Sequence, residues 1–281
     1  MTVLVHILLR LWEKFFDHRV MLIAGGVTYY LLLALFPALA AFVALYGFFA
    51  DPRTIAVHVA LLGDMLPSGG LELIRTQLDA LAAQDHGRLS FKVAFGLGFA
   101  LWSTNAGVKA MFDAMNVAYE EVEKRSFIGL TLQSGLFTIV VLFSGIMLII
   151  ALGVIPVVLA FVPIDGFTEK VISIGRWPLL VGGAWCTITA IYRYGPSRVR
   201  SKWRWLTWGA LLATIAWLLT SIGFTHYLRN FANYNAIYGS LGTVIGFMVW
   251  VWLSAMILIL GAEVNAAIEH KNDQPADEAA R

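Results

Sequence analysis

The chain has 281 residues, of which 59% are hydrophobic and 14% are charged. An average soluble domain is about 45–50% apolar and about 25% charged, so this composition lies outside the soluble range. The low charge and the 13% of aromatic residues exclude disorder, and the single cysteine, Cys186, excludes a disulfide scaffold within the chain. The composition therefore predicts an all-α polytopic membrane protein.

Six stretches without Asp, Glu, Lys or Arg divide the sequence. A helix needs about 20 apolar residues to cross about 30 Å of hydrocarbon, and four of the stretches are that long. The other two have 16 residues each and reach this length only if flanking Lys and Arg side chains extend toward the headgroups. Backbone polar groups in lipid need partners within their own segment, which requires helices. The expected spans, in one transmembrane domain of residues 1–270, are 24–49, 89–108, 133–161, 176–193, 206–228 and 240–263.

Basic residues predict the orientation of these spans. With the N-terminus inside, thirteen of the 20 Lys and Arg residues fall on the inner segments, and five of them lie between Arg193 and Arg204. Because positive charge on short loops stays on the cytoplasmic side, both termini are expected in the cytoplasm.

The segments outside the spans have distinct patterns. Apolar residues from Leu4 to Phe16 recur at helical spacing opposite charged residues, which predicts an amphipathic helix that is retained and lies in the membrane interface. Residues 51–88 are expected to form a small outer cap of two short helices, broken by turn residues at Pro67–Gly70. The cap is either a lid over a cavity or a stabilising plug, and the apolar stripe on its second helix favours the plug. Residues 271–281 are expected to be a disordered cytoplasmic tail.

Catalytic motifs are absent from the sequence. The six histidines have no H-E-x-x-H spacing, and there is no C-x-x-C, glycine-rich phosphate loop or G-x-S-x-G. Cys186 lies in an apolar span, where a thiol is typically inert packing. The sequence therefore predicts a protein that is not an enzyme and has no cofactor and no metal site.

One polar stretch lies at the outer mouth of the last span, where residues 230–246 read NFANYNAIYGSLGTVIG. Amide and phenol groups in lipid need partners or water, so this stretch either lines a wet cavity or forms a tight re-entrant turn with a tyrosine belt. Its small residues let another helix approach closely. The candidate binding residues here are Asn233, Tyr234, Asn235 and Tyr238, and the candidate packing residues are Gly239, Gly242 and Gly246.

A second polar point lies where the last span meets the cytoplasm, at Glu263 and Asn265. Ionisable groups so close to the bilayer core tend to be paired, and Arg193 is expected at the same depth. We therefore predict an ion pair from Glu263 to Arg193 or to Arg198 that closes the inner side; the alternative is a hydrated interfacial carboxylate.

Three further residues are candidates for binding or gating. Tyr29 and Pro37 belong to the first span, where the proline removes a helix hydrogen bond and permits a kink. Asn105 is an amide in the second span.

Several motifs resemble the YihY/BrkB family of bacterial inner-membrane proteins, sometimes labelled ribonuclease BN. The similarity runs from about Phe15 to Glu269, although Ala34 stands where the family often has Ser. The resemblance implies a six-helix, multi-pass envelope protein of the inner membrane, with both ends cytoplasmic and a proposed role in lipid or lipopolysaccharide-precursor transport. The nuclease label conflicts with the absence of catalytic residues. The motifs that carry the resemblance are LWSTNAGVKAMFDAMNVAYE (101–120), YRYGPSRVR (192–200), YNAIYGSLG (234–242) and GAEVN (261–265).

Two functions from different classes are compatible with these patterns. The leading hypothesis is a transporter or flippase of a lipid or other amphiphilic envelope component, with membrane lipids as its partners. The alternative is a non-transporting scaffold for envelope-biogenesis proteins, whose partners would be those proteins or a second copy of the chain. No nucleic-acid partner is expected. Since no ATP-binding motif is present, transport would be driven by an ion gradient, a partner or downhill lipid flow.

Overall fold

The computed structural model describes residues 11–47, 91–149, 166–198, 208–230 and 241–273. Within these ranges helices are the only regular secondary structure, which confirms the predicted all-α fold. A short helix, Leu11–Asp17, precedes the long ones. The long helices coincide with the six predicted segments and are α2 (Val20–Gly47), α5 (Phe91–Ala118), α6 (Phe127–Ile149), α8 (Gly166–Tyr194), α9 (Trp208–Asn230) and α11 (Leu241–Asp273).

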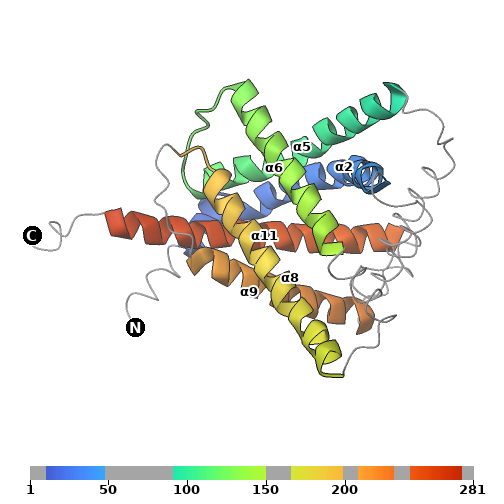
Figure 1. Ribbon diagram of the computed structural model, residues 1–281. Coiled ribbons are helices and arrows are strands. Elements are labelled where there is room, and N and C mark those ends of the chain that lie inside the picture. Colours follow the sequence, from blue (N-terminus) through green and yellow to red (C-terminus); the bar gives the residue numbers. More distant parts are fainter. Residues whose placement is uncertain (1–10, 48–90, 150–165, 199–207, 231–240, 274–281) are drawn as a thin grey trace, which may run out of the picture.

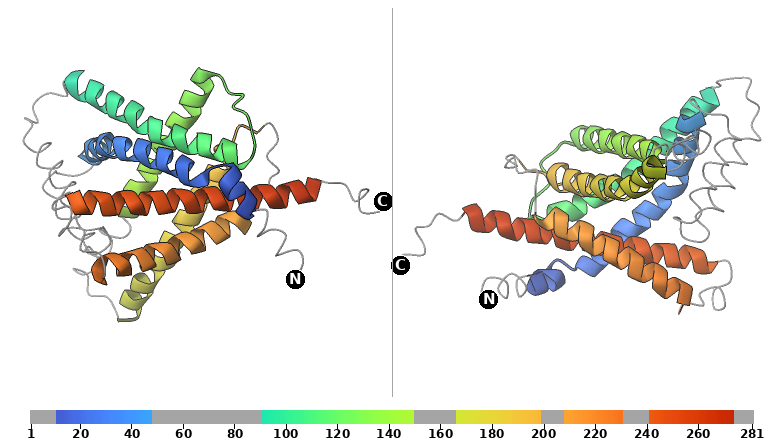
Figure 2. Two further views of the ribbon diagram at one scale, coloured as in Figure 1. Left: turned by 180° about the vertical axis from the view of Figure 1, so that it is seen from behind. Right: turned by 60° about the horizontal axis from the view of Figure 1, so that its bottom comes forward.

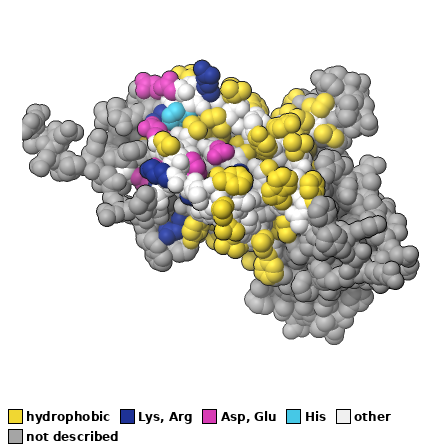
Figure 3. Space-filling view, turned by 90° about the horizontal axis from the view of Figure 1, so that it is seen from above, with side chains coloured by type: hydrophobic (Ala, Val, Ile, Leu, Met, Phe, Trp, Pro, Cys, Tyr) yellow, Lys and Arg dark blue, Asp and Glu magenta, His cyan; other side chains and the backbone are white. Residues whose placement is uncertain are grey.

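The long helices form two layers (Figures 1 and 2). Helices α5, α2, α11 and α9 lie next to one another in that order, and α6 and α8 cross one face of this layer. Consecutive long helices alternate in direction, so the starts of α2, α6 and α9 meet the ends of α5, α8 and α11. We call this the polar end, because charged side chains gather toward it on the face seen in Figure 3, while hydrophobic side chains cover much of the remaining described surface.

Three of the described helices are long and apolar enough to cross a membrane, over Phe127–Ser144, Trp208–Leu228 and Val244–Glu269. The short helix and Val20–Leu35 would make a fourth crossing if the bend of 59° between them belongs to one span. The membrane fold is thus supported, and the count of six crossings stays a prediction.

The long helices extend beyond the predicted spans at several ends. Helix α5 continues ten residues past position 108 and includes Lys109, and α8 begins ten residues before position 176. Helix α11 continues to Asp273, so the tail predicted from residue 271 begins in a helix. Charge-free runs mark where the side chains are apolar, whereas the backbone hydrogen bonds of a helix continue through polar residues outside the hydrocarbon. The predicted cap, 51–88, and residues 274–281 lie outside the described residues.

Small residues make up much of the interior beside a few large side chains such as Phe112 and Met115, and many large apolar side chains face outward. Ala24, Ala114, Ala210 and Ala255 are essentially fully buried, whereas much of the outer surface of α6 and α9 is apolar. This arrangement is typical of membrane helices, because lipid accepts the large side chains and small residues let backbones approach. Exposed apolar residues of α6 and α9 include Leu132, Leu136, Phe143, Leu219 and Ile222.

Helices α9 and α11 approach closely at Gly209 and Gly261. A Cβ atom at Gly209 would lie 2.2 Å from the carbonyl oxygen of Gly261, and one at Gly261 would lie 2.3 Å from Tyr192 Oη. Only hydrogen fits at either position. The predicted packing glycine Gly246 is also buried, and a Cβ there would meet Leu228 at an ordinary 3.6 Å. Gly242 is buried too, whereas Gly239 lies outside the described residues.

Gly209→Ala is expected to separate α9 from α11 and to destabilise the protein by about 1–3 kcal/mol, the usual cost of overpacking. The measurement is the thermal unfolding midpoint of purified protein in detergent. Gly223→Ala on the same helix is the matched control, because a Cβ there meets nothing within 4 Å. It should leave the midpoint unchanged or raise it, since Ala favours a helix by about 1 kcal/mol over Gly. Equal midpoints for the two variants would contradict the close crossing.

Candidate functional site

A carboxylate is buried at the polar end. Glu263 of α11 has no exposed side-chain surface, and its Oε1 lies 2.5 Å from His18 Nδ1. Lys14 Nζ lies 3.7 Å from the other carboxylate oxygen and 2.7 Å from Glu120 Oε1. His18 Nε2 lies 3.9 Å from that same Glu120 oxygen. We call these four residues the Glu263 cluster; they come from three separate parts of the chain.

Two unusual backbone conformations place the partners of Glu263. The chain turns between the short helix and α2 at His18 and Arg19, where the helices bend by 59°. Arg19 has a φ of 48° and Glu120, just after α5, has a φ of 54°. Positive φ is uncommon outside glycine, and such strain tends to occur at functional positions. Glu120 belongs to the Glu263 cluster, and Arg19 directly follows His18 in the sequence.

The structure corrects the predicted partner of Glu263. The buried acid is paired, as expected, but its partners are His18 and Lys14 rather than Arg193 or Arg198. Arg193 lies in the last turn of α8, with its guanidinium 5.5 Å from the Tyr194 ring. The reason is the bend before α2, which folds the N-terminal helix back over the end of α11.

Arg198 has a different set of contacts. Its guanidinium pairs with Glu269, donates to the Tyr192 carbonyl at 3.0 Å and stacks 3.8 Å from the Tyr119 ring centroid. Burial raises the pKa of Tyr119 to about 12, so its hydroxyl stays protonated at physiological pH. Tyr192 in turn donates to the Leu258 carbonyl at 2.7 Å. These contacts tie the end of α8 to α11.

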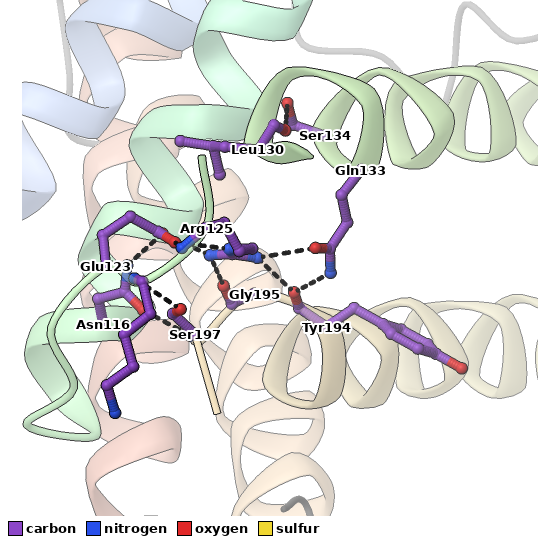
Figure 4. Close-up of polar contacts among 10 residues, drawn as sticks. Asn116, Glu123, Arg125, Leu130, Gln133, Ser134, Tyr194, Gly195 and Ser197 are labelled. Carbon is purple, nitrogen blue, oxygen red and sulfur yellow. Dashed lines mark hydrogen bonds and ion pairs between the residues drawn. The ribbon is translucent and has the colours of Figure 1, made fainter. Parts of the chain in front are cut away.

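A second network joins α5, α6 and α8 through Arg125 (Figure 4). Arg125 donates to Glu123 at 2.6 and 2.7 Å, to the Gly195 carbonyl at 2.8 Å and to the Tyr194 carbonyl at 3.3 Å. Gln133 of α6 donates to the same Tyr194 carbonyl at 2.9 Å. Arg125 therefore supplies partners for carbonyls at the end of α8 that no further helical turn could satisfy.

The loop before α6 is held by the same network. Asn116 of α5 donates to Glu123 at 3.0 Å and accepts from the Ser197 backbone at 2.7 Å. The Lys124 backbone donates to Ser197 Oγ at 3.0 Å. We call Asn116, Glu123, Arg125, Gln133 and Ser197 the Arg125 latch.

Polar residues also line the contact between α5 and α6, although α6 is mainly apolar. Ser134 and Thr138 are almost fully buried, as is Asn105 of α5. Asn105 donates to the Thr131 carbonyl at 3.4 Å, and Lys109 donates to Thr131 Oγ1 at 2.8 Å. We call Asn105, Lys109, Thr131, Ser134 and Thr138 the α5–α6 seam.

Polar groups of the seam can form more hydrogen bonds than the described residues provide. Each of the three seam hydroxyls, on Thr131, Ser134 and Thr138, donates to the carbonyl four residues earlier, at 2.6 to 2.8 Å. Their oxygens keep lone pairs that can accept further bonds. The Asn105 Oδ1 atom is buried and has no hydrogen-bond partner among the described residues. In lipid such groups are expensive, which makes the seam a candidate binding surface.

The structure places the predicted site residues in different surroundings. Tyr29 is exposed on α2, and Pro37 lies within the same helix. Asn105 belongs to the seam, and Asn265 is buried and accepts from the Gly209 backbone at 2.9 Å. The candidates Asn233, Tyr234, Asn235 and Tyr238 lie outside the described residues.

Sequence reasoning missed Lys14, His18 and Arg125 as site residues. Lys14 falls on the charged face of the predicted amphipathic helix, but only 24% of its side chain is exposed. Trp12 and Phe16 of that helix are exposed, whereas Phe15 packs against the core. The signal that could have found Lys14 is its spacing from His18, four residues along one helical face.

Comparison with known proteins gives consistent similarities. The family model described as "Virulence factor BrkB" matches residues 11–281. The chain is 30% identical over 273 residues to the ribonuclease-like protein YfkH of Bacillus subtilis (strain 168), covering 95% of this chain and 96% of that protein. It is 24% identical over 269 residues to a UPF0761 membrane protein of Pseudoalteromonas translucida, covering 93% of this chain and 85% of the relative. No solved structure matches the chain.

The Arg125 latch generates a prediction about pH. Hydrogen bonds from the Arg125 side chain lower the pKa of Glu123 from 4.5 to about 2. A carboxylate whose pKa is lowered by folding stabilises the protein above its unfolded pKa, and this contribution disappears as the pH falls toward the folded pKa. Glu123→Gln should therefore lower the thermal unfolding midpoint at neutral pH, and the difference from wild type should shrink between pH 4.5 and pH 2.

Glu121→Gln is the matched control, because Glu121 lies in the same loop and pairs with the exposed Lys124. Exposed pairs contribute little, so this variant should keep a midpoint close to that of wild type. A Glu123→Gln variant with an unchanged midpoint at neutral pH would contradict the latch.

Proposed function

This chain belongs to the BrkB family of membrane proteins, and we propose that it transports a lipid or another amphiphilic envelope component between the two leaflets. The observation that carries the proposal is the α5–α6 seam. Moving an amphiphile across a bilayer requires a polar path for its headgroup through hydrocarbon that excludes polar groups. The seam offers hydroxyls, an amide and an ammonium group along one helix pair.

The depth of the seam supports this role. Thr138 lies eleven residues after Phe127, the first residue of α6. At 1.5 Å per residue this corresponds to about 16 Å, or about half of the 30 Å hydrocarbon thickness. Asn105 lies at a comparable distance from the end of α5. If the hydrocarbon begins at Phe127, polar groups would continue from the Arg125 latch to about the middle of the bilayer.

The seam is closed in this structure, because Ser134 and Thr138 are buried against the bundle. Transport therefore requires α6 to move away from α5, with the headgroup taking the place of α5 as a polar partner. The acyl chains would stay in lipid along the outer face of α6, which is apolar. Lys109 favours a headgroup that carries a negative charge, such as a phosphate.

A scaffold without transport is the second candidate. It is favoured by the broad apolar outer face of α6, since large exposed apolar surfaces also serve as docking sites for other membrane proteins. We propose membrane lipids as the main partners, and envelope proteins or a second copy of the chain under the scaffold hypothesis. The proposal includes no catalysis and no nucleic-acid partner. The ribonuclease-like name belongs to the Bacillus subtilis relative. RNA cleavage by a highly purified sample of this protein would contradict the proposal that it is not a nuclease.

We also propose that the protein lies in the inner membrane with the polar end and both termini in the cytoplasm. The polar end carries Lys14, Lys124, Arg125 and Arg198, which fits the positive-inside rule. Reporter fusions at the two termini that report opposite sides would contradict this orientation.

The transport proposal predicts a loss of rate when the seam loses polarity. In vesicles with a labelled phospholipid, wild-type protein should move the label between leaflets faster than protein-free vesicles do. Asn105→Leu and Thr138→Val should slow it about fivefold, the effect of losing one hydrogen bond worth about 1 kcal/mol. The measurement is the fraction of label that remains protected from a membrane-impermeant quencher over time.

Thr225→Val on α9 is the matched control for Thr138→Val. Thr225 also donates to the carbonyl four residues earlier, at 2.8 Å, but its side chain is exposed. It should transport at the wild-type rate. Wild-type rates equal to those of empty vesicles for anionic and zwitterionic lipids alike would reject transport and favour the scaffold.

A further inference from the structure

We propose that His18 and Glu263 form a proton-binding site, and that its proton holds the short helix Leu11–Asp17 against the bundle. Binding of one proton would thereby couple a pH gradient to movement of α2. The role of this proton in driving transport rests on the transport function proposed above. The proton site itself rests only on the geometry of the polar end.

The surroundings of the imidazole fit its protonated form. Nδ1 lies 2.5 Å from Glu263 Oε1, and Nε2 lies 3.9 Å from Glu120 Oε1. Both ring nitrogens thus face carboxylate oxygens, which accept hydrogen bonds and cannot donate them when ionised. A neutral imidazole has one N–H donor and one acceptor, so one of its nitrogens would face a carboxylate without a proton between them. An imidazolium donates from Nδ1 to Glu263, and its second N–H lies on the side of Glu120 at ion-pair distance.

The balance of charge also favours one proton on the His18–Glu263 pair. Four titratable groups of the described chain face one another here: Lys14 from the short helix, His18 from the turn, Glu120 after α5 and Glu263 from α11. With His18 protonated, two cations face two carboxylates. Without that proton, Glu263 keeps a buried charge whose nearest ammonium group is 3.7 Å away. Breaking a buried pair by removing one partner is strongly destabilising, so the cluster has to rearrange.

The element that would move when the cluster rearranges is the short helix Leu11–Asp17. It meets α2 at a bend of 59°, and Arg19 at the bend is in the left-handed conformation. Trp12 and Phe16 are exposed on the side away from the cluster, as expected for a helix that rests in the membrane interface. Loss of the proton would release this helix from α11 while the aromatic side chains keep it at the membrane surface.

Release of the helix would be transmitted through α2 to the seam. Helix α2 packs closely on α5, where a Cβ at Gly107 would lie 3.0 Å from Leu31 and 3.3 Å from Ala34. Gly107 is two residues from Asn105. Movement at the start of α2 therefore acts on the helix that forms one side of the seam.

The test measures docking of the helix separately from transport. Full-length protein with Cys186 replaced by Ser carries spin labels at Glu13→Cys and Lys124→Cys and is reconstituted in vesicles of phosphatidylethanolamine and phosphatidylglycerol. One distance is expected at the acidic end of a pH series, and a second population should grow as the pH rises. The ratio of populations should change by up to about tenfold per pH unit, the limit for one proton.

Variants separate the proton site from other histidines and carboxylates. His18→Lys carries a permanent charge and should stay docked at every pH, whereas Glu263→Gln should lose the pH response. Glu269→Gln, six residues further along α11 and paired with Arg198, is the control and should respond as wild type does. If Glu263→Gln fails to fold, His18→Lys alone decides. A wild-type distance that does not change with pH, or a His18→Lys protein that responds like wild type, overturns the proposal.

Transport of labelled lipid is then measured in the same vesicles with and without a pH gradient. If the distances respond to pH and no lipid moves, the proton site stands and the proposed function fails. If lipid moves and the distances do not respond, transport stands and the proton site fails.

Discussion

Hydrocarbon offers no hydrogen-bond partner, and this constraint explains where the polar side chains of the protein lie. The outer faces of α6 and α9 are apolar, whereas buried polar atoms meet one another at the polar end and along the α5–α6 seam. Even single carbonyls follow this rule: those of Tyr194 and Gly195, at the end of α8, receive their hydrogen bonds from Arg125 and Gln133. The polar contacts therefore determine which helix ends come together.

The approximate positions of the long helices could be predicted from the sequence, because each helix contains a long run of apolar residues. Each of the six charge-free stretches corresponds to a long helix, and α9 at Trp208–Asn230 lies within two residues of the prediction at both ends. The boundaries of α5 and α8 could not be predicted in the same way. Their helical backbone continues through Lys109 and Arg176. These charged residues mark the ends of the apolar region, but the backbone hydrogen bonds of the helix continue beyond them.

Only some residues of the candidate site could be predicted from the sequence. Glu263 and Asn105 were recognisable because an acid or an amide beside an apolar span needs a partner. The partners were not recognisable, since His18 is separated from Glu263 by 245 residues and reaches it only through the bend before α2. Arg125 could not be singled out from the sequence, because its charged neighbours Glu121, Glu123 and Lys124 are typical of a solvated helix surface, whereas Arg125 donates to carbonyls about seventy residues away.

The long separation of His18 and Glu263 has a consequence for biosynthesis. Chains are made and generally folded from the N-terminus, so the first helix emerges long before its buried carboxylate partner exists. Lys14 and His18 must stay hydrated at the membrane surface until the last helix, α11, arrives. Docking of the short helix Leu11–Asp17 therefore depends on α11, and a nascent chain that ends before α11 leaves this helix without its buried carboxylate partner.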